Sequence, residues 1–128
     1  MKLSYKDIID KHKGKPCVIA GHGPSIDPFK EQIQKLQMED KLLRISVNNW
    51  FDYFETKPDY WVISNGEFTL KSGLLNDGWW QHQGYPADAY NAFNVPVLFA
   101  DNADMTDYDL IDQLGKFDYL PYDTRHFK

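Results

Sequence analysis

The chain of 128 residues has one cysteine, no long apolar run and no excess of positive charge, and each shortage excludes a class of protein. Its only cysteine, Cys17, rules out a disulfide-stapled fold, and we interpret it as a small buried hydrophobe within a strand. The apolar runs span a few residues, which is too short to cross a membrane. A net charge of −5 argues against a general nucleic-acid binder, which normally carries a basic face.

The N-terminal residues also lack the apolar core of a signal peptide, so we expect a cytoplasmic protein with neither membrane nor nucleic-acid partners. An apolar share of 42% fits a globular protein, and the length suits one domain over residues 1–128, which we expect to be either a minimal form or a fragment of a longer protein. Nine of the fourteen basic residues lie within residues 1–44, so an anionic ligand is favoured near this half. The sequence leaves the oligomeric state open, and a homo-oligomer is among the expectations.

Short apolar runs alternate with helical patterns along the chain. They predict five strands, over Cys17–Ala20, Leu42–Val47, Tyr60–Ser64, Pro96–Ala100 and from Tyr119. The helical patterns predict three helices. They span Ser4–His12, Pro28 to about Gln37, and a segment that begins after Thr106, and Asp27 is the predicted N-cap of the second helix. Residues 67–94 read as a long loop with short helices. This alternation predicts a Rossmann-like α/β three-layer sandwich with a mainly parallel sheet of about five strands.

The most informative stretch is the glycine loop, Gly21-His22-Gly23-Pro24-Ser25, directly after the first predicted strand. It lacks the third glycine of the dinucleotide fingerprint and the Gly-Lys-Ser/Thr of a Walker loop. Exposed amides in such a loop suit a phosphate, although a plain strand-to-helix turn explains the glycine spacing equally well. Because the Asp27 carboxylate would repel a phosphate at the helix end, we expect the amides of Gly23 to Ser25 to make the contact. His22 is either a solvent-exposed loop residue or a phosphate donor and acid–base group.

Polar clusters also follow the second and third predicted strands. They are Asn48-Asn49 and Ser64-Asn65-Gly66-Glu67. Because the carboxyl ends of parallel strands meet at one edge, where ligands bind in such sheets, we expect these clusters to converge with the glycine loop. The sequence therefore predicts a binding site that includes Asn48, Asn49, Ser64 and Asn65. Glu67 lies at the same edge and is the predicted general base or metal ligand.

Three segments together resemble a known family. They are Val18–Asp27, Ser46–Asn49 and Lys57–Ser64. They are similar to the 6-hydroxymethylpterin pyrophosphokinase MptE-like family, whose Rossmann-like domain begins with a Gly-x-Gly-Pro-Ser-Leu loop and has a Lys-Pro-Asp turn before a later strand. The loop, with an asparagine at the next strand end, also resembles bacterial sialyltransferases that use a CMP-sugar donor. The resemblance implies that Gly21, Gly23, Pro24 and Ser25 face the nucleotide, and that Asn48 or Asn49 hydrogen-bonds its phosphate or sugar.

We therefore expect a nucleotide-binding transferase that moves a sugar or phosphoryl-type group from a CMP- or ATP-type nucleotide or nucleotide-sugar. The alternative is a non-catalytic nucleotide- or anion-binding module, or a structural protein that keeps a Rossmann-like core. Mg²⁺ is a candidate cofactor, because Asp107-Tyr108-Asp109 matches the Asp-x-Asp pattern of many glycosyltransferases. Thr106 and Asp109 fit a helix-capping box equally well, so no residue is assigned as a metal ligand.

Overall fold

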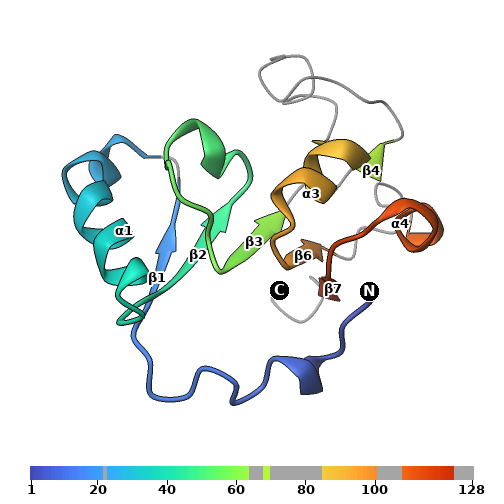
Figure 1. Cartoon of the computed structure of the whole chain (residues 1–128), viewed down its shortest axis with the longest axis horizontal. Coiled ribbons are helices and arrows are strands. Elements are labelled where there is room, and N and C mark those ends of the chain that lie inside the picture. The colour runs from blue at the N-terminus through green and yellow to red at the C-terminus, as the bar shows by residue number, and fades with distance from the viewer. Residues whose placement is uncertain (22, 64–67, 70–84, 101–107, 123–128) are drawn as a thin grey trace.

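The computed structural model describes residues 1–21, 23–63, 68–69, 85–100 and 108–122 (Figure 1). One sheet holds five strands, in the order β1 (Cys17–Ala20), β2 (Leu43–Val47), β3 (Tyr60–Ile63), β6 (Val97–Ala100) and β7 (Tyr119–Tyr122). Every neighbouring pair in this sheet is parallel, which confirms the predicted α/β fold. A second, short parallel pair joins β4 (Phe68–Thr69) to β5 (Tyr85–Pro86).

Among the described residues, the α-helices are α1 (Lys30–Met38), α3 (Ala87–Phe93) and α4 (Tyr108–Leu114), with 3₁₀ turns η1 (Tyr5–Asp7), η2 (Pro24–Phe29) and η3 (Trp50–Asp52). α1 and α4 follow strands of the large sheet, and α3 follows β5 of the short pair. Because the strand order never reverses, right-handed crossovers bring these connections to one face of the sheet. α3 lies in the region predicted as a loop with short helices, of which residues 70–84 lie outside the described part.

Alternate strand side chains confirm which face the helices cover. The buried core joins strand residues to helix side chains from α1, α3 and α4; these are Ala20, Trp61, Ile63, Val97, Phe99 and Tyr119 with Ile33, Ala87, Tyr90 and Ile111. We call this side of the sheet the helix-covered face and the opposite side the outer face. Aromatic rings dominate the core, since Trp61 lies 6.0 Å from Trp50 and 5.0 Å from Tyr90 between ring centroids. The third layer of the predicted sandwich stays a prediction.

The N-terminal helix predicted over Ser4–His12 is wrong. Ser4 and Asp7 do form a capping contact, in which the Ser4 N–H donates to Asp7 Oδ2 at 2.7 Å. The 3₁₀ turn η1 nevertheless ends at Asp7, and the left-handed backbone of Asp10, with φ 62°, prevents a helix from continuing to His12. Ile9 in this segment is 63% exposed. The segment instead runs from the β7 side of the sheet to the start of β1 (Figure 1).

The predicted N-cap at Asp27 is also wrong. Pro24 and Pro28 both lie within the 3₁₀ turn η2, and α1 begins only at Lys30 with Phe29 as its cap. A proline nitrogen has no hydrogen to donate, so Pro28 cannot form the α-helical bond back to Pro24. The Asp27 carboxylate pairs with Lys30 Nζ at 2.7 Å instead of capping the helix.

The two edges of the large sheet differ in how they are covered. At β7, Lys2 pairs with Tyr119, and the Leu3 N–H donates to the Tyr119 carbonyl at 2.6 Å. β1 forms the opposite edge, where Cys17 is exposed and Ile19 is 70% exposed. The prediction of a buried Cys17 is therefore wrong, because its strand lies at the edge and its side chain on the outer face. No helix in the described residues is long and apolar enough to cross a membrane.

Candidate functional site

The loops that follow β1 and β2 lie next to each other at the carboxyl edge of the sheet. Ala20, the last residue of β1, is in register with Ser46, and Asn48 follows β2 directly. The two connections also meet beyond the sheet, since Lys30 Nζ lies 5.5 Å from the centre of the Tyr53 ring. The structure therefore brings Gly21 and residues 23–25 of the glycine loop close to Asn48-Asn49, as the parallel-strand argument predicts.

The glycines of the loop are not required by the fold itself. Among the described glycines only Gly14 has a positive φ, 83°, so Gly21 and Gly23 adopt backbones open to other residues. A Cβ built on Gly21 would meet no atom within 4 Å, and one on Gly23 would make an ordinary 3.6 Å contact with Ser25 Oγ. The missing side chain of Gly21 thus leaves open space above the loop, where a ligand can approach the backbone.

The amide groups of the loop are arranged by η2. Pro24 has no N–H, and the Ile26 N–H donates to the Gly23 carbonyl at 3.2 Å. The geometry of a first turn leaves the Ser25 N–H without a partner inside the helix. The Lys30 ammonium offsets the nearby Asp27 carboxylate at 2.7 Å, which weakens the predicted repulsion of a phosphate.

The two asparagines are held differently. Asn48 adopts a left-handed backbone with φ 53°, and its carbonyl accepts a 2.6 Å hydrogen bond from Trp61 Nε1. Its N–H donates to the Val62 carbonyl at 2.9 Å, so the bend after β2 is tied to β3. Asn49 Nδ2 donates to Asp52 Oδ2 at 2.8 Å. The side chain of Asn49 therefore already stabilises η3, and its amide oxygen is the atom left for a ligand.

Sequence reasoning missed two buried polar groups below these loops. Ser46 is fully buried in β2 on the helix-covered face, and its hydroxyl has no hydrogen-bond partner among the described residues. Trp50 Nε1, at the start of η3, is likewise buried and unpaired there. Leaving a buried donor unsatisfied costs about 1–3 kcal/mol, so each is a candidate ligand-binding group. The available signal for Ser46 was a serine inside a strand that, apart from Arg44, is apolar.

Several predicted site residues lie outside the described part of the chain. They are His22, Ser64, Asn65, Glu67, Thr106 and Asp107. Asp109 is exposed in the first turn of α4, and no cluster of three or more histidine, cysteine or acidic side chains in the described residues could hold a metal ion. Partial burial, and then the charge of Asp59, raise the pKa of the Cys17 thiol, which disfavours the reactive thiolate.

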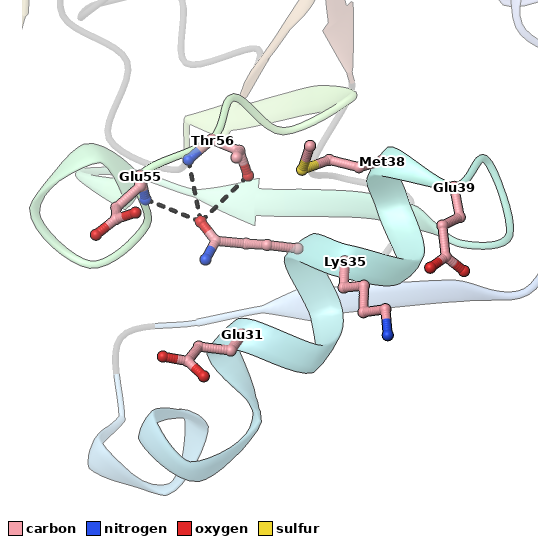
Figure 2. Close-up of a pocket in the computed structure, with 7 residues that line it drawn as sticks. Glu31, Lys35, Met38, Glu39, Glu55 and Thr56 are labelled. Carbon is pink, nitrogen blue, oxygen red and sulfur yellow. Dashed lines mark hydrogen bonds between the residues drawn. The ribbon is translucent and has the colours of Figure 1, made fainter.

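A pocket of about 490 Å³ lies apart from these residues (Figure 2). One side of α1 and the segment that leads into β3 line it, with Glu31, Gln34, Lys35, Met38, Glu39, Glu55 and Thr56. Gln34 Oε1 connects the two sides of the pocket, because it accepts hydrogen bonds from the N–H groups of Glu55 and Thr56 at 2.9 and 3.0 Å. The lining contains no predicted site residue, so the candidate site stays at the carboxyl edge.

Comparison with known proteins adds no name to this geometry. No family model matches the chain, and the searches of curated proteins and of solved structures also found no match. What the chain shows is an α/β fold with a five-stranded, all-parallel sheet consistent with a Rossmann-like class.

Proposed function

We propose that this protein is a nucleotide-binding transferase that moves a sugar or phosphoryl-type group from a nucleotide donor. The observation that supports it most directly is the open space above Gly21, next to Asn48 and Asn49 at the carboxyl edge. The fold alone does not explain a glycine at this position, whereas a phosphate held against the backbone does.

The proposed site offers a hydrogen-bonding group to each part of such a ligand. The Ser25 N–H and the Lys30 ammonium are donors for the phosphates, and the Asn49 amide oxygen is an acceptor for a sugar hydroxyl. Catalysis then rests on positioning the donor and on stabilising the charge of its phosphate leaving group. The family resemblance supports a cytidine or adenine nucleotide, and Mg²⁺ as its counter-ion.

A thermal-shift screen tests the binding step. CMP, CDP, ATP, GTP and nucleotide-sugars would each be added with and without Mg²⁺. A specific ligand at about one hundred times its dissociation constant stabilises the native state by about 2.7 kcal/mol. A cytidine-selective shift supports the sugar-transfer form of the proposal, and an Mg²⁺-dependent ATP shift supports the phosphoryl-transfer form. No shift with any nucleotide on folded protein would overturn the proposal.

Glu67→Gln separates a transferase from a module that only binds. If Glu67 is the general base, this variant loses turnover of the bound donor and keeps its affinity, because the amide preserves size but cannot accept the proton. Glu55→Gln, in the pocket away from the site, is the matched control and should keep both. Unchanged turnover in Glu67→Gln would contradict the assignment of Glu67 as the general base. The thermal-shift screen would then still decide whether the protein binds a nucleotide.

A further inference from the structure

We propose that the β1 edge of the sheet pairs with the β1 edge of a second copy of this chain. β1 is a terminal strand, and no strand of the described residues covers its outer side. The other terminal strand, β7, is bordered by the N-terminal residues through the Lys2 and Tyr119 pairing. The fold thus closes one edge and leaves the other with unused backbone groups.

The unused backbone groups belong to Cys17 and Ile19. The Leu43 N–H donates to the Pro16 carbonyl at 2.9 Å, so the backbone of Pro16 faces β2. Backbone groups alternate in direction along a strand, which turns Val18 and Ala20 toward β2 as well. The N–H and C=O groups of Cys17 and Ile19 therefore point away from the sheet.

β1 is short, with four residues, but it lacks the charges, prolines and bulges that natural proteins use to block an edge. Cys17 to Ala20 contains no charge and no proline, and its register with β2 runs without a bulge. Ile19 is 70% exposed on the outer face, beside the half-buried Ile45 of β2. An uncharged, apolar edge strand of this kind is a template for pairing with another strand.

Symmetry selects how two copies can meet. A strand that pairs with itself about a two-fold axis must do so antiparallel. With the axis at Val18, Cys17 lies opposite Ile19 of the other copy, and these residues exchange four N–H···O=C hydrogen bonds in total. The opposed side chains are apolar on both faces, so the pairing extends the sheet to ten strands and covers Ile19.

The charges that flank β1 favour this antiparallel arrangement with a second copy. Residues 11–15 hold three lysines and no acid, and residues 21–25 hold no lysine, arginine or acid. With the axis at Val18, an antiparallel pair places the lysines of each copy beside this uncharged segment of the other. A parallel arrangement would bring the basic segments together.

Light scattering coupled to size-exclusion chromatography tests the pairing, in reducing buffer so that Cys17 cannot form a disulfide. The wild type should have twice the chain mass of 15.0 kDa. Ile19→Lys, which places two ammonium groups across the axis, should weaken association by roughly tenfold or more and give the monomer mass. Met38→Lys is the matched control, because Met38 is 78% exposed on α1 and should leave the dimer intact.

Ile19→Pro gives a second test through the backbone. It removes an N–H that faces away from β2, which an edge strand tolerates, and it deletes two of the four bonds between copies. Circular dichroism of each variant checks that the sheet is retained. A monomeric wild type at high micromolar concentration, or a dimer that survives both Ile19 variants in folded form, would overturn the proposal.

Discussion

A single methyl group at Gly21 tests the argument that its open space serves a ligand. In Gly21→Ala the added Cβ meets no protein atom within 4 Å, and the backbone φ of Gly21 is not positive. Replacing glycine with alanine where the native backbone allows it reduces the entropy of the unfolded chain and stabilises by about 0.4–1 kcal/mol. We therefore expect a free energy of unfolding that is unchanged or slightly higher, together with a loss of nucleotide binding.

Gly115→Ala is the matched control at a glycine that the fold does need. There a Cβ would lie 2.7 Å from the Ile111 carbonyl oxygen and 3.3 Å from Phe117 Cε1. Ile111 and Phe117 are each 1% exposed, so neither neighbour has room to retreat. Forcing a methyl group into such a contact costs about 1–3 kcal/mol, and we expect this loss of stability with ligand affinity retained in the folded fraction.

Urea denaturation measures the stability of both variants, and calorimetric titration measures the affinity for whichever nucleotide the wild type binds. A methyl group that intrudes on a phosphate contact should lower the affinity about tenfold or more, since 1.4 kcal/mol is a factor of ten. Two results would refute the reasoning. One is a Gly21→Ala protein that binds as the wild type does, and the other is one that unfolds as readily as Gly115→Ala.

Two further predictions concern stability. Gln34→Ala removes the acceptor of the Glu55 and Thr56 N–H groups and should destabilise the native state by about 1 kcal/mol or more. The control is Gln32→Ala on the exposed side of α1, which should leave the stability unchanged. Equal urea midpoints for the two variants would contradict this prediction. The free energy of unfolding should fall as the pH rises above 10. The reason is that burial raises the pKa of five tyrosines, namely Tyr60, Tyr85, Tyr90, Tyr119 and Tyr122. At this pH the native state therefore keeps protons that the unfolded state loses. Burial lowers the pKa of Arg44 to about 10, which acts in the opposite direction but is one group against five; a urea midpoint that holds above pH 10 would contradict the prediction.

The positions of the strands were predictable because each is a short apolar run that a polar or turn residue ends. β1 has the predicted bounds, and β2 and β6 begin one residue later than predicted. The start of α1 was not predictable from capping rules, because Pro24 and Pro28 together produce a 3₁₀ turn that moves the helix to Lys30. Local sequence patterns therefore predicted where the strands lie, but they did not predict that two prolines would delay the start of α1 to Lys30.

The environment of a strand depends on its neighbours, which the local sequence does not contain. Cys17 lies in a run as apolar as a central strand, yet it is exposed because β1 is terminal in the sheet order. For the same reason the sequence shows a serine in β2 but not that its hydroxyl has no partner among the described residues, since its burial depends on residues from several elements. The meeting of the glycine loop with Asn48 was predictable, because it needs only that β1 and β2 be parallel neighbours.

The unreversed strand order explains why both proposals converge on β1. In a sheet whose order reverses, the strand that carries a phosphate loop lies in the centre, and loops flank it on both sides. Here β1 is terminal, and among the described residues the loop after it is flanked by the β2 connection alone, which contains Asn48 and Tyr53. A second copy paired along Cys17 and Ile19 would supply the missing neighbour, because its Pro16 would lie beside Ala20, the last residue of β1. Edge pairing would therefore provide the proposed ligand site with the second wall that a central strand otherwise gives.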